Sequence, residues 1–126
     1  MSESNYDRGL ARRREVMGDT FVDRALENTS DFTRPLQDLV TANCWGETWE
    51  RDDLPLKTRS LITISLLTAL RASTELKGHI RGALNNGCTV EEIRGALLHA
   101  TVYCGVPAGV EAFRAADEVI GDWVDA

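Results

Sequence analysis

Apolar residues recur every three to four positions along most of this chain of 126 residues, which is the spacing of helices that bury one face. No stretch alternates apolar and polar residues in the manner of a half-buried strand. Linkers, repeats and low-complexity tracts are absent from the sequence. The pattern therefore predicts an all-α protein that folds as a single domain over residues 1–126.

The first third of the chain predicts three helices. An arginine-rich surface helix over residues 6–17 is expected to stop at Gly18, and Asp19 is expected to cap a short second helix. The third helix starts at Asp31 or Thr33 and has Pro35 in its first turn, where a missing N–H does no harm. The expected buried sides comprise Phe21, Val22, Ala25 and Leu26 in the second helix, and Phe32, Leu36, Leu39, Val40 and Asn43 in the third.

The rest of the chain predicts four longer helices. Pro55 marks the start of one that runs to about residue 72 and is apolar nearly all round, so it is expected to be central and buried. Helices over residues 74–86 and 90–104 follow, the second opened by a capping box of Thr89 and Glu92. The last helix, over residues 107–124, has an apolar side of Val110, Phe113, Ala116, Val119, Ile120 and Trp123. A short chain has few ways to cover an all-round apolar helix, which predicts a homo-oligomer.

Composition excludes several classes of function. A net charge of −6 without a basic patch argues against a nucleic-acid partner. The longest apolar run, residues 61–70, is too short for a membrane span of about 20 residues, and the polar first residues predict no signal peptide. Cys44, Cys88 and Cys104 are odd in number and form no C-x-x-C pair, which favours a reducing, cytoplasmic setting with Cys88 and Cys104 buried.

Three residues suggest proton transfer and carboxylate binding. His79 lies one helical turn after Glu75, so the two side chains can share a hydrogen bond or a proton. The alternative is a solvated pair on a helix surface. Arg59 lies among apolar residues, either in an ion pair with Glu47 or Glu75 or as a clamp for a substrate carboxylate.

Two further candidates are less specific. The segment from Trp45 through Glu47 to Trp49 suits either a packed corner or the wall of a small apolar pocket that holds one acid. His99, one turn before Tyr103, is either a core histidine with its hydrogen bonds satisfied or a functional one. The residues alone thus predict a small helical enzyme or binding protein with a His/Glu/Arg pocket.

Five segments in order resemble the carboxymuconolactone decarboxylase family: W-G-E-T-W (45–49), L-x-x-K-T-R-S-L (54–61), E-L-x-x-H-I-R-x-A-L-x-N-G (75–87), E-E-I (91–93) and Y-C-G-V-P-A (103–108). The resemblance covers nearly the whole chain. A redox branch of the superfamily carries C-x-x-C before the matching histidine, but these positions are Ala72 and Glu75 here, so thiol peroxidase chemistry is not expected. Gly95 departs from the resemblance, which implies a larger, often acidic residue there.

The resemblance implies an alkylhydroperoxidase-like subunit of six or seven helices, assembled as a homotrimer or homohexamer. It implies decarboxylation of a γ-carboxylated butenolide in the β-ketoadipate pathway, without a metal or an organic cofactor. By position, the implied catalytic residues are His79, Glu75 and Glu47, and the implied substrate-binding residues are Arg59, Trp45 and His99. The alternatives are a decarboxylase or hydrolase of another small carboxylated lactone, and a non-catalytic oligomeric binding module.

Overall fold

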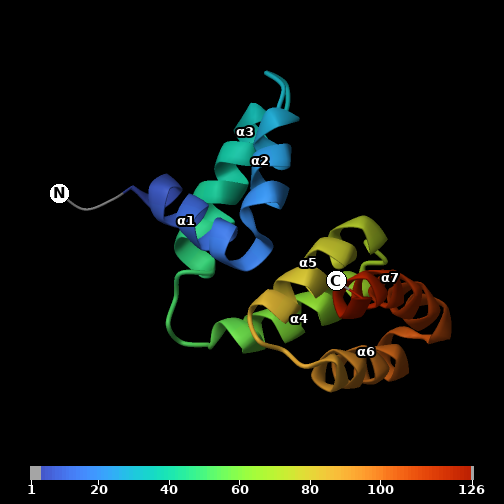
Figure 1. Ribbon diagram of the computed structural model, residues 1–126. Helices are drawn as coiled ribbons and strands as arrows, with labels where there is room; N and C mark the ends of the chain where they lie inside the picture. The colour runs from blue at the N-terminus through green and yellow to red at the C-terminus, as the bar shows by residue number, and fades with distance from the viewer. Residues whose placement is uncertain (1–3, 126) are drawn as a thin grey trace. The chain divides into compact units, whose positions relative to one another are not determined.

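A computed structural model describes residues 4–125, with side chains described up to Trp123, and every regular element in this part of the chain is a helix (Figure 1). The all-α prediction and the expected number of helices are therefore confirmed. The chain divides into two compact units, one ending at Pro55 and the other beginning at Leu56, and each is described by itself. A single domain over residues 1–126 stays a prediction.

The first unit contains three α-helices and a π-helical segment, in which the backbone hydrogen bonds span five residues. The elements are α1 (Asn5–Met17), α2 (Asp19–Glu27), α3 (Arg34–Leu39) and η1 (Val40–Thr48). Helix α1 packs closely against η1 because glycines lie where the two backbones meet. A Cβ atom on Gly9 would overlap the carbonyl oxygen of Thr41, and one on Gly46 would overlap that of Asn5.

Helix α1 is less superficial than its charge predicts. Val16 and Met17 are buried, and so is Arg13, whose guanidinium donates from Nη1 to the side chains of Gln37 and Thr41. Burial lowers the pKa of Arg13. The bonds of Arg13 link α1 to α3 and η1, so a residue expected at the surface instead stabilises the interior of this unit.

Two expectations for the first unit are wrong in detail. Gly18, with φ of 91°, occupies the N-cap position expected for Asp19, which is the first residue of α2. Only Val22 is buried in α2, and the expected apolar face of α3 is exposed at Phe32, Leu36 and Leu39. The reason is that α3 has only six residues, continues directly into η1 and has few contacts with other helices, so none of its residues is buried.

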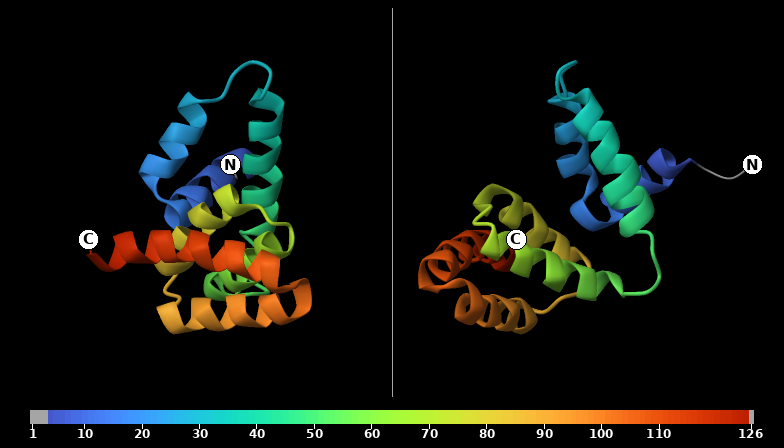
Figure 2. Two further views of the ribbon diagram at one scale, coloured as in Figure 1. Left: turned by 90° about the vertical axis from the view of Figure 1, so that its right-hand side faces the viewer. Right: turned by 180° about the vertical axis from the view of Figure 1, so that it is seen from behind.

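The second unit is a bundle of four helices: α4 (Leu56–Ala69), α5 (Ser73–Asn85), α6 (Val90–Cys104) and α7 (Val106–Asp125). Helices α4 and α5 form a hairpin, and α6 and α7 lie side by side against it (Figure 2). The core they share includes Ile64, Leu76, Ile80, Ile93, Leu97, Ala112 and Val119. Gly109 allows α7 to approach α6, because a Cβ atom there would overlap Thr101.

The predicted start of α6 is confirmed. The Thr89 hydroxyl accepts from the N–H of Glu92 at 3.0 Å, and the Glu92 carboxylate accepts from the N–H of Thr89 at 2.9 Å. The Thr89 N–H, with help from Lys57, holds the pKa of Glu92 below its ordinary value. This capping box satisfies two backbone donors that helix geometry would otherwise leave without partners.

The prediction that α4 is buried all round is wrong for the single chain. Its buried residues are Ser60, Ile64 and Thr68, whereas Ile62 and Leu66 are exposed. Thr68 is buried without a penalty because its hydroxyl donates to the carbonyl of Ile64 at 2.8 Å. The buried side of α4 therefore combines Ile64 with two small hydroxyl residues, while Ile62 and Leu66 face outward.

Three further findings concern the rest of this unit. Cys88 is buried as expected, but Cys104 is exposed because it ends α6 at the surface. On α7, Ala116 and Val119 are buried, while the expected apolar side is partly exposed at Val110 and Trp123. None of the described helices is long and apolar enough to cross a membrane.

The contact of α1 with η1 predicts that Gly9→Ala lowers the free energy of unfolding by about 1–3 kcal/mol, because the added methyl group forces two backbones apart. The measurement is urea unfolding of both proteins. Gly95→Ala is the matched control: this exposed glycine of α6 has no neighbouring atom within 4 Å of an added Cβ, so the exchange is expected to stabilise by up to about 1 kcal/mol. Equal stability of the two variants would contradict the described contact.

Candidate functional site

Glu75 and His79 lie in the first two turns of α5. Leu76 and Ile80, each one position later, are fully buried and fix the rotation of this helix. Glu75 is consequently exposed and His79 half-buried, at the edge of the helix face that packs. Among the residues that the structure describes, no hydrogen bond or ion pair joins Glu75 to His79. The orientation of His79 by Glu75 thus stays a prediction.

The turn that leads into α5 is held by an unusual backbone conformation. Arg71 has φ of 56°, the only positive φ of a non-glycine residue in the described part of the chain. Its guanidinium makes two parallel hydrogen bonds to the Glu111 carboxylate of α7, from Nε to Oε2 at 3.0 Å and from Nη2 to Oε1 at 2.5 Å. The same contact lowers the pKa of Glu111.

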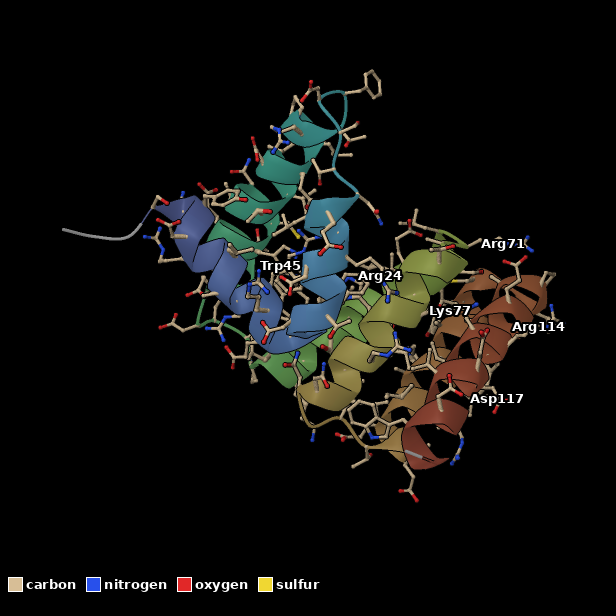
Figure 3. The ribbon with its side chains drawn as sticks, turned by 45° about the horizontal axis from the view of Figure 1, so that its top comes forward. Arg24, Trp45, Arg71, Lys77, Arg114 and Asp117 are labelled. Atoms are coloured by element: carbon tan, nitrogen blue, oxygen red, sulfur yellow. The ribbon has the colours of Figure 1, made fainter. Side chains whose placement is uncertain are left out.

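A second ion pair, from α5 itself, reaches α7 about two turns beyond Glu111. Lys77 Nζ lies 2.8 Å from Glu118 Oε2. Figure 3 labels Arg71 in the turn before α5, Lys77 on α5 and Arg114 on α7. Exposed ion pairs add little stability one by one, so their main effect here is to define how α5 lies against α7.

Arg59 is half-buried on α4, the helix that forms the hairpin with α5. Its neighbour Ser60 is buried and its hydroxyl accepts from Asn86 Nδ2 at 2.9 Å; the same amide lies 3.4 Å from the carbonyl of Leu56. Asn86 follows the last residue of α5, so these bonds connect the end of α5 to the start of α4. Sequence reasoning identified Asn86 only as a helix stop and missed this role; its amide side chain was the available signal.

Trp45 and Glu47 belong to η1 in the first unit (Figure 3 labels Trp45). The rings of Trp45 and Trp49 stack, with centroids 4.7 Å apart and planes inclined by 23°, and both residues are buried. Glu47 is exposed, and its Oε1 accepts from Asn5 Nδ2 at 2.8 Å. The two tryptophans therefore stack in the interior, while the carboxylate points to the surface. Sequence reasoning did not predict the π-helix, a conformation often found at functional sites.

His99 is not a core residue, which corrects the first interpretation of this histidine. The buried side of α6 consists of Ile93, Leu97 and Ala100, so His99 is exposed. Its ring centroid lies 5.0 Å from that of Tyr103. It borders a hollow of about 370 Å³ between α4 and α6, which also has Thr58, Leu61, Ile62, Ser65, Leu66 and Ala96 in its walls.

The second unit thus carries Arg59, Glu75 and His79 on one hairpin and His99 on a neighbouring helix, and the first unit carries Trp45 and Glu47. A cation, an acid and an imidazole on one hairpin suit the binding of a carboxylate and the transfer of a proton. In the part of the chain that is described, no three His, Cys, Asp or Glu residues are grouped as metal ligands would be.

Comparison with known proteins identifies the family of the chain. A family model described as the carboxymuconolactone decarboxylase family matches residues 34–118, about two thirds of the chain. The chain is 47% identical over 120 residues to the nitrosuccinic acid decarboxylase npaB of Metarhizium robertsii, covering 95% of this chain and 84% of that protein. It is 43% identical over 120 residues to a 4-carboxymuconolactone decarboxylase of Acinetobacter baylyi, covering 95% of this chain and 90% of that protein.

A more distant match covers only part of its relative. Peroxisomal protein 2 of Saccharomyces cerevisiae is 31% identical over 87 residues, which are 66% of this chain and 31% of that protein. The two matches that extend over nearly the whole chain are both decarboxylases by name. The chain therefore belongs to the carboxymuconolactone decarboxylase family, with its alkylhydroperoxidase-like helical fold, and is a carboxy-lyase.

Proposed function

We propose that the protein converts 4-carboxymuconolactone to 3-oxoadipate enol-lactone and CO2 in the protocatechuate branch of the β-ketoadipate pathway, without a cofactor. The observation that carries this proposal is the 43% identity to a 4-carboxymuconolactone decarboxylase across 90% of that protein's length. The placement of Arg59 and His79 on one hairpin supports it.

The substrate contains its own electron acceptor, so the chemistry needs few protein groups. Loss of CO2 breaks the bond between the γ-carbon and its carboxylate, and the electron pair moves through the ring double bond to the lactone carbonyl oxygen. A proton then adds at the carbon α to that carbonyl. The protein has to hold the carboxylates, stabilise charge on the lactone oxygen and deliver this proton.

We assign these tasks by residue type and place in the fold. Arg59 binds a substrate carboxylate or polarises the lactone, because its planar guanidinium offers paired donors. His79 donates the proton, with Glu75 as the group that orients it. Glu47 is a second acid candidate. Trp45, as an apolar wall, and His99 are assigned to substrate binding.

A second candidate substrate is nitrosuccinic acid, favoured by the 47% identity to a decarboxylase named for it. Its nitro group is attached to the carbon that loses CO2, so the electron pair moves onto the nitro oxygens and a proton returns to that carbon. Each of the two acids retains one carboxylate after the loss of CO2, and each contains its own acceptor for the electron pair. Arg59 and His79 would serve the same two roles for either acid.

We propose further that the active form is a homotrimer or homohexamer built on an apolar face of α4 and α6. This α4–α6 face presents six large side chains that are 44–80% exposed: Ile62, Leu66, Leu70, Leu98, Val102 and Tyr103. An apolar surface of this extent on a small protein is typical of an interface. A second copy of the chain would also cover the hollow beside His99.

The first prediction concerns the substrate. Purified protein without added metal or cofactor is expected to release CO2 from freshly prepared 4-carboxymuconolactone and to form the enol-lactone, followed by ultraviolet absorbance. Nitrosuccinic acid is assayed in parallel. Faster turnover of nitrosuccinic acid would replace the proposed substrate by the second candidate, and no turnover of either acid would contradict both.

The second prediction separates the two histidines. His79→Gln is expected to lower kcat by about 10²–10⁴-fold, because a general acid contributes that much to a proton transfer. His99→Gln, which changes a residue assigned to binding, is expected to raise KM and leave kcat nearly unchanged. The measurement is steady-state kinetics with the preferred acid. A kcat of His79→Gln within about twofold of the parent would remove His79 as the proton donor.

The third prediction tests the interface. Leu66→Glu places a charge at the centre of the α4–α6 face and is expected to dissociate the oligomer, because burying a carboxylate there costs several kcal/mol. Thr74→Glu, an exposed position on α5 outside this face, is the control and is expected to leave the assembly intact. Sedimentation at micromolar concentration measures the mass. Parent protein that sediments as a single chain would refute the proposal.

A further inference from the structure

A separate hollow of about 120 Å³ lies between α6 and α7, and none of the roles proposed above uses it. Its walls are apolar, with Ile93 and Leu97 from α6 and Phe113 and Ile120 from α7. Ile93 and Leu97 are fully buried, so the inner end of this α6–α7 hollow is part of the core. A space of this size accommodates a branched aliphatic group or a small ring.

Two residues of opposite charge also line the α6–α7 hollow: Arg94 on α6 and Asp117 on α7. Both are exposed, and among the described residues neither forms a hydrogen bond or an ion pair, with each other or with a third residue. Two other carboxylates of α7 are paired, Glu111 with Arg71 and Glu118 with Lys77. Figure 3 shows Asp117 on the same helix, beyond Arg114. The hollow therefore offers a cation and an anion that no side chain neutralises.

These features restrict the ligand by its chemistry. A purely apolar molecule would bring the two charges into partial desolvation without compensation. A simple anion would suit Arg94, but it would lie close to the Asp117 carboxylate and leave the apolar walls empty. A molecule that carries a carboxylate, an ammonium group and a short aliphatic body satisfies both charges and fills the space.

We propose that the α6–α7 hollow binds a free aliphatic α-amino acid. The carboxylate of the ligand lies against the Arg94 guanidinium, which offers paired donors for it. The ammonium group lies against Asp117, and the side chain fills the space between Ile93, Leu97 and Phe113. The site is independent of decarboxylation, because it uses none of the residues to which that reaction has been assigned.

Ligand-observed saturation-transfer NMR with L-leucine tests this site and is suited to weak binding. A molecule of this size is expected to bind with a Kd of about 1 mM. Three probes each lack one part of leucine: 4-methylpentanoate lacks the ammonium group, 3-methylbutylamine lacks the carboxylate, and glycine lacks the aliphatic body. Each probe is expected to bind at least about tenfold more weakly than leucine. Equal binding of 4-methylpentanoate and leucine would overturn the assignment of an amino acid.

The same titration with variants locates the site. Arg94→Gln and Asp117→Asn are each expected to weaken leucine binding by about tenfold, because each removes a charged hydrogen-bond partner. Both side chains are exposed, so the fold is expected to tolerate the exchanges. Arg114→Gln and Asp122→Asn make the same changes on α7 outside the hollow and are expected to leave the Kd unchanged. Absence of leucine binding to the parent, or binding that neither Arg94→Gln nor Asp117→Asn weakens, would refute the proposal.

Discussion

The burial of one side of α5 is the constraint on which the second unit depends. Leu76 and Ile80 are fully buried one turn apart, and they fix the rotation of the helix about its axis. Successive helix residues are separated by about 100° of rotation, so the residues just before these two lie at the edge of the buried side. Glu75 and His79 occupy those positions. The packing that stabilises the bundle is thus also the reason why Glu75 is exposed and His79 half-buried on α5.

Close contacts between helices are made by the smallest side chains of this protein. Gly9 and Gly46 allow α1 to approach η1, Gly109 lies against Thr101, and Ser60 and Thr68 face the interior of the bundle from α4. The buried hydroxyls carry little cost because they are hydrogen-bonded, Thr68 to its own helix and Ser60 to Asn86. Ile62 and Leu66 of α4 face outward, on the face that we propose a second copy of the chain covers.

Ion pairs also help to define how the helices of the second unit pack. Arg71 and Lys77 pair with carboxylates of α7 and define how that helix lies against α5. The left-handed conformation of Arg71 is compatible with this pairing, although such a conformation costs about 1–2 kcal/mol in a residue with a side chain. Arg94 and Asp117, in contrast, form no ion pair among the described residues, and both line an apolar hollow.

The helical class, most helix boundaries, the capping box at Thr89 and the family could be predicted from the sequence, because they depend on local spacing and on ordered motifs. The sequence also placed Glu75 and His79 one turn apart, which follows from helix geometry alone. Only the tertiary structure decided which side of each helix is buried. An apolar residue such as Leu66 satisfies the same periodic pattern whether it faces the core or the surface. The burial of a histidine such as His99 cannot be predicted until its neighbours in the fold are known. Side-chain contacts between distant segments, such as those of Asn86 with Ser60 and of Arg71 with Glu111, depend on how the helices pack, which local patterns do not specify.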